Sequence, residues 1–157
     1  MSIIGLKAFI CEPCIFANED RTIVIGAYVD DLLVAAQHPD LITDLVRRIS
    51  GKINITHKGQ VKNFLGISVT VDRERITFDQ SPHIHRLLKE QSLVDCNGAA
   101  TPMPPGKILD PSEEDEFTNT TSYQSLVGSL LHIANFTRPD IGFAVGQLCR
   151  FMSAPRV

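Results

Sequence analysis

The stretch IVIGAYVDDLLVAA, residues 23–36, decides the expected fold of the first part of the chain, because two adjacent carboxylates interrupt two apolar runs. A buried strand does not tolerate a bare charge without a partner. Asp30 and Asp31 are therefore predicted to form the two-residue turn of a β-hairpin, between a strand over 22–29 and a returning strand over 32–36. Continuous apolar strands are usually covered on both faces, and the same is expected here. Either the pair simply fills a surface turn, where aspartate is common, or it has a charged function.

Further elements are predicted close to this hairpin. An apolar strand over 6–16 precedes it, and the polar residues 18–21 form the connecting turn. After it, a helix is predicted over 39–50, with Pro39 at its first position and Gly51 at its end.

A second hairpin is predicted over residues 64–80, where apolar and polar residues alternate on both sides of a charged turn. Ser81 and Pro82 then resemble the cap and the first position of a helix. Residues 95–122 have no periodicity and are rich in proline and acidic residues, so a linker or long loop is predicted. The acidic run 113–116 is typical of a solvated surface.

Two stripes of apolar residues near the C-terminus predict a pair of helices. The first stripe consists of Tyr123, Leu126, Val127, Leu130, Leu131 and Ala134, and the second of Ile141, Ala144, Val145, Leu148, Cys149 and Met152. Residues 137–140 are predicted to form the turn between the two helices.

The bulk composition bounds the possible classes of protein. With 157 residues, of which 43% are hydrophobic, the chain is long enough for one domain with a real core. The net charge of −3 argues against a strongly basic nucleic-acid-binding protein but permits a local basic groove. No apolar run approaches the length of a membrane helix, so no membrane partner is expected. The N-terminus lacks the features of a signal peptide, so an intracellular location, cytoplasmic or nuclear and not secreted, is expected, with the cysteines as thiols.

Adjacent carboxylates on a tight turn have a specific chemical use. Asp30 and Asp31 project in different directions, yet both can reach one point above the turn. Mg²⁺ prefers oxygen ligands and typically takes one or two carboxylates together with substrate phosphates. Two-metal phosphoryl transfer needs such ligands to clamp the attacking and the leaving oxygen, and rigid apolar strands would hold them in place.

The letters around the pair resemble those of a known family. YVDD (28–31) with apolar flanks resembles the catalytic hairpin of reverse transcriptases, and the rest of the chain is similar, in order, to the Ty1/copia retrotransposon type. CEPCIF (11–16) resembles the segment before the catalytic strand, and FLGISV (64–69) resembles the primer-grip region. TPM (101–103) matches the usual linker. Residues 123–155, YQSLVGSLLHIANFTRPDIGFAVGQLCRFMSAP, match the C-terminal signature of the family.

The resemblance implies a role for each matching residue of the hairpin. Asp30 and Asp31 would be the catalytic, metal-binding carboxylates of an RNA-directed DNA polymerase (a nucleotidyltransferase), with Mg²⁺ as the cofactor of a two-metal site. Tyr28 would lie near the nucleotide and the template–primer. The partners of the complete enzyme would be an RNA or DNA template–primer and deoxynucleoside triphosphates.

The resemblance also implies residues that bind nucleic acid. Phe64, Leu65 and Gly66 would help to place the primer terminus, with Gly66 permitting a close approach of the backbone. Arg86 and Lys89 would lie on a thumb-like helix and contact the duplex backbone without reading its sequence. The alternative for Phe64 and Leu65 is an ordinary strand core, and the alternative for Arg86 and Lys89 is a solvated helix face.

The fold class that follows is α+β: a partial polymerase palm with antiparallel hairpins and flanking helices, followed by a C-terminal helical pair. The expected organisation is a partial palm with the catalytic and primer-grip hairpins over 1–80, a thumb-like helix over 81–95, a linker over 96–122 and a helical connection region over 123–157 that leads toward an RNase H domain.

The sequence also departs from the family pattern. A further catalytic aspartate of the family lies upstream of the matching region, as do the fingers, and nothing in residues 1–22 replaces that aspartate. A lysine common before the primer grip is displaced: Thr56 stands near its place and Lys58 follows, so no proton-donor role is assigned. With fewer metal ligands and less positioning of the nucleotide, the chain alone is expected to have no useful polymerase activity. The strand 23–29, without its palm neighbour, is expected to expose an apolar edge that favours self-association.

Two other classes of function stay open. A retained, non-enzymatic fragment could bind nucleic acid or a protein, although no basic stripe supports strong nucleic-acid binding. Zinc or redox chemistry at CEPC (11–14) would need Cys96 and Cys149 as further ligands, and these do not form a second CxxC pair. His83 and His85 are expected to face different ways on one helix, and His38, His57 and His132 to be single surface or core residues.

Overall fold

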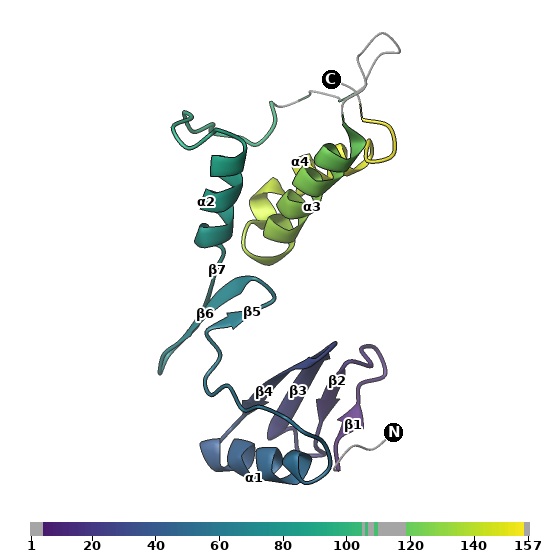
Figure 1. Ribbon diagram of the computed structural model, residues 1–157, viewed down its shortest axis with the longest axis vertical. Coiled ribbons are helices and arrows are strands. Elements are labelled where there is room, and N and C mark those ends of the chain that lie inside the picture. Colours follow the sequence, from purple (N-terminus) through teal and green to yellow (C-terminus); the bar gives the residue numbers. More distant parts are fainter. Residues whose placement is uncertain (1–4, 105, 107–108, 110–118, 156–157) are drawn as a thin grey trace. The chain divides into compact units, whose positions relative to one another are not determined.

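The computed structural model describes residues 5–104, 106, 109 and 119–155 (Figure 1). Its contacts divide the chain into two compact units, Met1–Val61 and Lys62–Val157. Each unit is described by itself. The expected organisation by role, with boundaries at 80, 95 and 122, stays a prediction.

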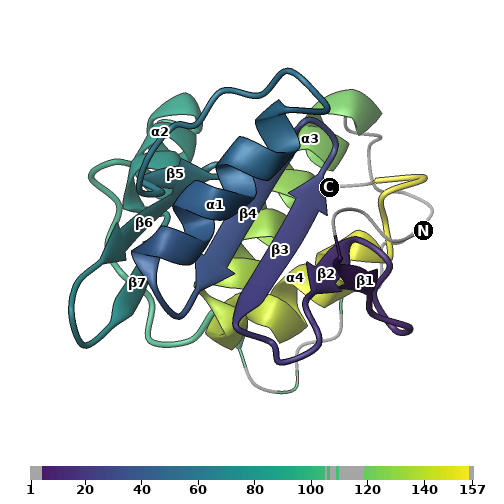
Figure 2. The same cartoon turned by 90° about the horizontal axis from the view of Figure 1, so that it is seen from below.

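The first unit is a four-stranded antiparallel sheet with one helix on it. The strands are β1 (Lys7–Ala8), β2 (Ile15–Ala17), β3 (Ile23–Tyr28) and β4 (Asp31–Ala36), in the order β1-β2-β3-β4, and the helix is α1 (Pro39–Ser50). Figure 2 shows α1 lying across β3 and β4. The core between helix and sheet consists of Leu6, Ile23, Ile25, Leu45 and Ile49.

Within the described part of the first unit, the hairpin strands are covered on one face and not on both as expected. Val34 and Ala36 of β4 pack against the core under α1. Leu33 points to the opposite face, since successive side chains of a strand alternate, and it is 36% exposed. A single helix covers only one face of this unit, so the continuous apolar run does not indicate burial on both sides.

The expected free edge also lies elsewhere. β3, the strand of IVIGAY, is hydrogen-bonded to β2 on one side and to β4 on the other. The expectation that this strand exposes an edge is therefore wrong. Within the part of the chain that the structure describes, the sheet ends at β1 and β4, so the second strand of the hairpin carries a free edge.

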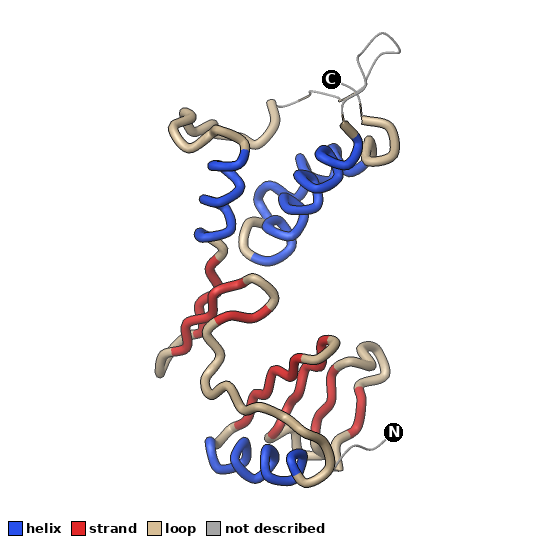
Figure 3. Tube along the Cα trace, in the orientation of Figure 1, coloured by secondary structure: helices blue, strands red, loops and turns tan. Residues whose placement is uncertain are grey.

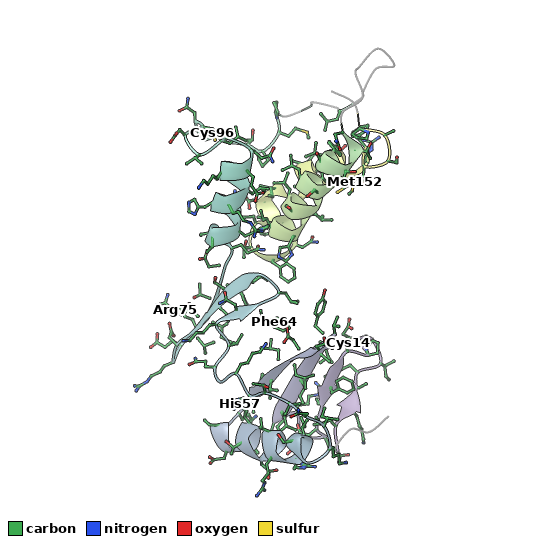
Figure 4. The ribbon with its side chains drawn as sticks, viewed as in Figure 1. Cys14, His57, Phe64, Arg75, Cys96 and Met152 are labelled. Atoms are coloured by element: carbon green, nitrogen blue, oxygen red, sulfur yellow. The ribbon has the colours of Figure 1, made fainter. Side chains whose placement is uncertain are left out.

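The predicted strand over 6–16 is interrupted. Only the short β1 and β2 form, and Cys11 and Cys14 lie in the loop between them (Figure 4). The predicted turn over 18–21 is confirmed: the Asn18 side-chain oxygen accepts a hydrogen bond from the Ile23 backbone N–H at 2.8 Å, and its amide donates to Thr22. Helix α1 begins at Pro39 and is capped at its end by Gly51, as predicted.

The second unit contains a smaller antiparallel sheet and three helices. Its strands are β5 (Asn63–Phe64), β6 (Ile67–Val71) and β7 (Ile76–Asp79), in the order β5-β6-β7, and its helices are α2 (Ser81–Glu90), α3 (Thr120–Phe136) and α4 (Gly142–Cys149). The predicted second hairpin is confirmed by the pairing of β6 with β7. In the tube of Figure 3, β7 leads directly into α2.

The predicted cap of α2 is shifted by one residue. Ser81 is the first helical residue and Gln80 is the N-cap, because Asp79 accepts hydrogen bonds from both the backbone and the hydroxyl of Ser81. The C-terminal helical pair is confirmed, with a short 3₁₀ turn, η1 (Pro139–Ile141), between α3 and α4. The Tyr123 hydroxyl donates to the Leu148 carbonyl at 2.8 Å and ties the two helices together.

The fold is thus mixed α+β with antiparallel sheets and four α-helices among the described residues, as predicted at that level. The acidic run 113–116 of the expected linker lies outside the described residues. Of the helices that the structure describes, none is long and apolar enough to cross a membrane.

Candidate active site

The two aspartates of the β3–β4 hairpin do not form its turn together. Tyr28 pairs with Asp31, so Val29 and Asp30 are the turn residues and Asp31 opens β4. The prediction of a turn made of Asp30 and Asp31 is wrong by one residue. The physical reason lies in Val29, whose φ of +50° reverses the chain one residue earlier. Positive φ is rare for a β-branched residue, which makes this a strained position.

The hairpin presents its polar groups to solvent. Directly paired residues of an antiparallel ladder share a face, so Tyr28 and Asp31 lie side by side on one face. Asp30 is exposed at the turn itself, and Tyr28 is 55% exposed. The chain has therefore placed two carboxylates and a phenol at one accessible end of a rigid ladder.

Asp31 has a partner that the sequence did not reveal. The ammonium group of Lys58 donates to Asp31 Oδ1 at 3.2 Å. The side chains of Lys58 and Asp31 are 79% and 57% exposed, so this ion pair contributes little to stability, of the order of 0–1 kcal/mol. The two residues are far apart in sequence and follow no local spacing rule, so only the fold brings them together.

The donor set at the hairpin fits a hard cation in part. Two carboxylates supply the oxygen ligands that Mg²⁺ prefers, but a complete site usually needs more ligands or waters. No group of three or more histidine, cysteine, aspartate or glutamate side chains gathers anywhere in the described residues. This finding gives no support to a zinc site built from CEPC, and all four cysteines of the chain are free thiols.

The expected primer-placing residues form a second tight turn. Phe64 pairs with Ile67, so Leu65 and Gly66 are the two residues of the β5–β6 turn. Both have positive φ, +51° and +79°, as a type I′ hairpin turn requires. Glycine adopts this conformation without strain, whereas leucine does not. Phe64, labelled in Figure 4, is half-buried on β5.

The basic residues of α2 differ in their surroundings. Arg86 contacts the Nδ1 of His83 at 2.9 Å and lies 3.8 Å from a carboxylate oxygen of Glu90. Lys89 is exposed and lies in the last turn of the helix. Both side chains reach solvent, but Arg86 has partners on its own helix.

A cluster of polar side chains joins α2 to α3, and sequence reasoning missed it. The Thr137 hydroxyl donates to Gln80 Oε1 at 2.7 Å, and Gln80 is only 2% exposed. The rings of His83 and His132 meet edge to face, with centroids 5.8 Å apart. His83 and His85 do face different ways, as expected, but His132 is not an isolated residue.

The pKa of His83 is lowered from its ordinary value. Burial is the main cause, because it disfavours the charged imidazolium, and the positive charge of Arg86 and the neighbouring His132 act in the same direction. The imidazole of His83 is therefore held in its neutral form more strongly than a free histidine.

The sequence has clear relatives among known proteins. The family model described as reverse transcriptase (RNA-dependent DNA polymerase) matches residues 6–105. The chain is 33% identical over 141 residues to a transposon Ty5-1 protein of Saccharomyces cerevisiae, covering 89% of this chain and 46% of the relative. It is 32% identical to the retrovirus-related Pol polyprotein from transposon RE1 of Arabidopsis thaliana, covering 82% of this chain and 9% of that relative. No solved structure matches.

The chain therefore belongs to the reverse transcriptase family. Its relatives also include the retrovirus-related Pol polyprotein from transposon TNT 1-94 of Nicotiana tabacum, which is 28% identical over 155 residues and is covered to 12% of its length. The Ty1/copia resemblance expected from YVDD and the C-terminal signature is confirmed. The chain spans less than half the length of each of these three relatives.

Proposed function

We propose that the chain supplies the catalytic hairpin and the primer-placing turn of an RNA-directed DNA polymerase that copies retrotransposon RNA. The observation that carries this proposal is the exposed pair Asp30 and Asp31 at the end of the β3–β4 ladder, with Tyr28 beside Asp31. On this proposal the β3–β4 hairpin is part of a polymerase palm.

The proposed roles follow from the chemistry of the side chains. Asp30 and Asp31 would hold Mg²⁺, which supplies charge stabilisation for the attacking and leaving oxygens of nucleotidyl transfer. Lys58 would give up its contact with Asp31 or share that carboxylate, since its exposed ammonium has a weak hold on it. Tyr28 would orient the nucleotide and the primer end from the same face as Asp31.

The second unit supplies the proposed nucleic-acid contacts. The positive-φ turn of Leu65 and Gly66 brings bare backbone to an exposed position, where a primer terminus can approach closely. Arg86 and Lys89 on α2 would contact phosphates of the template–primer duplex, a contact that does not depend on base sequence.

We further propose that the chain by itself has no useful polymerase activity. Two carboxylates alone clamp a metal pair weakly, and the described residues offer no third ligand near them. Effective positioning of the nucleotide is a large part of catalysis, and on this proposal Tyr28 alone among the described residues contributes to it.

The test is primer extension on an RNA template with Mg²⁺ and nucleotides, with and without the upstream polymerase region of a copia-type relative added in trans. We expect no extension by the chain alone and extension with the added region. The double variant Asp30→Asn/Asp31→Asn should lower that extension at least about 100-fold, because removing metal ligands costs transition-state stabilisation.

The matched control is Glu12→Gln/Asp20→Asn, which removes the same charge from exposed positions of the same unit. Extension that is equal in the aspartate variant and in the control would contradict the proposed metal role. Extension by the unmodified chain alone would contradict the proposed inactivity.

A second candidate, a non-enzymatic module that binds nucleic acid or a protein, is favoured by one observation. The free edge of β4 carries the exposed apolar residues Leu32 and Leu33. We propose that this edge lets the chain associate with a second copy of itself, since an unpaired apolar edge is a template for another strand.

A further inference from the structure

We propose that His132 on α3 is a positioning residue for the turn Leu65–Gly66, and that it makes the C-terminal helical pair a working part of the primer-placing unit. This inference rests on the proposed function of that turn. His132 lies within the C-terminal signature of residues 123–155, but sequence reasoning assigned this residue no role.

The first observation is direct proximity. A β-carbon added to Gly66 would lie 3.8 Å from Nε2 of His132, which is ordinary van der Waals contact. The imidazole therefore lies beside the backbone of the turn, although the two residues are far apart in sequence. Glycine is favoured at this position by its φ of +79° and not by lack of space, since the added β-carbon would not clash with the ring.

The second observation is the strain in the turn. Leu65 has a φ of +51°, a strained conformation that a leucine rarely adopts. Such a conformation persists only where the surroundings hold it in place. His132 lies against the second residue of the same turn and is placed to provide that support.

The third observation is that the His132 ring contacts two further rings. The His83 ring of α2 meets it edge to face, with centroids 5.8 Å apart. The Phe136 ring, one helical turn further along α3, lies 5.0 Å away between centroids. These two contacts restrict the orientation of the imidazole, so its position beside the turn follows that of α3.

The fourth observation concerns the junction between α2 and α3, which consists of Gln80, His83, His132 and Thr137. This junction contains buried polar groups, although apolar side chains would destabilise the folded state less. Gln80 is bonded to Thr137 at 2.7 Å, but its Nε2 and the Nε2 of His83 are buried and have no hydrogen-bond partner. Burying such groups without a hydrogen-bond partner destabilises the folded state. A junction that served stability alone would be filled by apolar side chains. We infer from its polar groups that it fixes the orientation of α3, and with it that of the His132 ring.

The test uses the full chain and three variants. In His132→Ala the support of the turn is lost, in His132→Phe a planar ring is kept, and Asn135→Ala is a control at an exposed position of the same helix. Hydrogen exchange of backbone amides is measured by NMR without nucleic acid. We expect at least tenfold faster exchange at Leu65–Ser68 in His132→Ala, near-native exchange there in His132→Phe, and no change in Asn135→Ala.

The pattern of exchange separates positioning from general stability. Exchange in α3 and at Thr70–Ile76, the far end of the β6–β7 hairpin, should stay within about twofold of the native value. An unchanged turn in His132→Ala, or an equal increase across the whole second unit, would overturn the proposal.

A second readout addresses the use of the turn. Anisotropy titrations compare an RNA–DNA duplex with a recessed primer end and a blunt duplex of equal length. The preference is the ratio of the Kd for the blunt duplex to the Kd for the duplex with the recessed end. We expect His132→Ala to lower this ratio at least threefold. The salt dependence of binding to the blunt duplex should not change. If the native chain shows no preference for the recessed end, the proposed function of the turn fails, while the exchange data still decide the role of His132.

Discussion

Single residues in unfavourable conformations mark both candidate turns. Val29 and Leu65 each take a positive φ beside the residues proposed to act, Asp30 and Gly66. Backbone strain of this kind clusters at functional sites, because the surrounding structure holds a geometry that the isolated turn would not choose. At the residue scale, the turns are therefore the places where stability and proposed function oppose each other.

Replacing Val29 by glycine should stabilise the chain. The substitution Val29→Gly relieves the strain of a β-branched residue at φ +50°, partly offset by the greater entropy of glycine in the unfolded state. We expect a net increase of about 1 kcal/mol in the free energy of unfolding, measured by urea titration. The control Ala27→Gly, inside β3, should lower it by about 0.5–1 kcal/mol. A loss of stability in Val29→Gly would contradict this prediction. It would show that the valine side chain stabilises the folded state by more than its positive φ destabilises it.

A second residue-scale prediction concerns His83 and pH. Because its folded-state pKa lies below the ordinary value of 6.5, the unfolded chain binds more protons as the pH falls. The contribution of His83 to stability is thus fully present above pH 6.5 and is lost as the pH falls through and below that value. The facing charged groups are His132, Arg86 and Glu90, and Glu90 alone opposes the shift.

Urea unfolding of the second unit is monitored by NMR at pH 7.5 and at pH 5.5, and the urea concentrations at the unfolding midpoint are compared. We expect a lower midpoint at pH 5.5, and a smaller difference in His83→Gln than in the control His85→Gln on the exposed side of α2. Asp72, Asp79 and Asp140 have lowered pKa values, so their contributions are lost only at more acidic pH, below their ordinary value of 3.8. Equal pH dependence in both variants would contradict the assignment to His83.

At the scale of the element, β4 is one of the two edge strands of the sheet in the first unit, the other being β1. Its six residues, DLLVAA, contain neither lysine nor proline, two residues that often prevent edge pairing, and its one charged residue, Asp31, stands at its first position. α1 covers one face of the sheet, but the hydrogen-bonding edge of β4 meets no other described strand. An edge with this composition can pair with the same edge of a second copy.

The substitution Leu33→Lys should weaken that association. A lysine on an edge strand disfavours pairing through its charge. The apparent molar mass is measured by light scattering over a concentration series. For the native chain it should rise above the monomer mass as the concentration increases, and for Leu33→Lys it should stay near the monomer mass. The control Leu93→Lys replaces an exposed leucine of the second unit and should behave like the native chain. A native chain that stays monomeric throughout would argue against the edge as a contact.

At the scale of the whole molecule, the sequence predicted the elements better than their contacts. Periodicity found α1, the β6–β7 hairpin and the C-terminal helical pair, because each depends on residues that are neighbours in the chain. It misplaced the free edge of the sheet and the turn at Val29–Asp30, since strand order and exact turn register depend on distant segments.

The candidate site shows the same division. YVDD and FLG were recognisable as short local motifs, and the family they indicated is confirmed. The contact of Lys58 with Asp31 and that of His132 with Gly66 join segments far apart in sequence. No spacing rule relates such pairs, so the residues that hold the motifs in place were invisible until the fold was known.

The ion pair between Lys58 and Asp31 gives the aspartate a counter-ion of its own. Lys58 belongs to the stretch that follows α1 and runs toward the boundary at Val61, so an electrostatic contact ties that stretch to the hairpin. Any external cation that takes Asp31 must compete with this ammonium, and by linkage each weakens the other's hold by the same factor. A cation bound at Asp31 would therefore release Lys58, and with it one weak, exposed contact of that stretch with the hairpin.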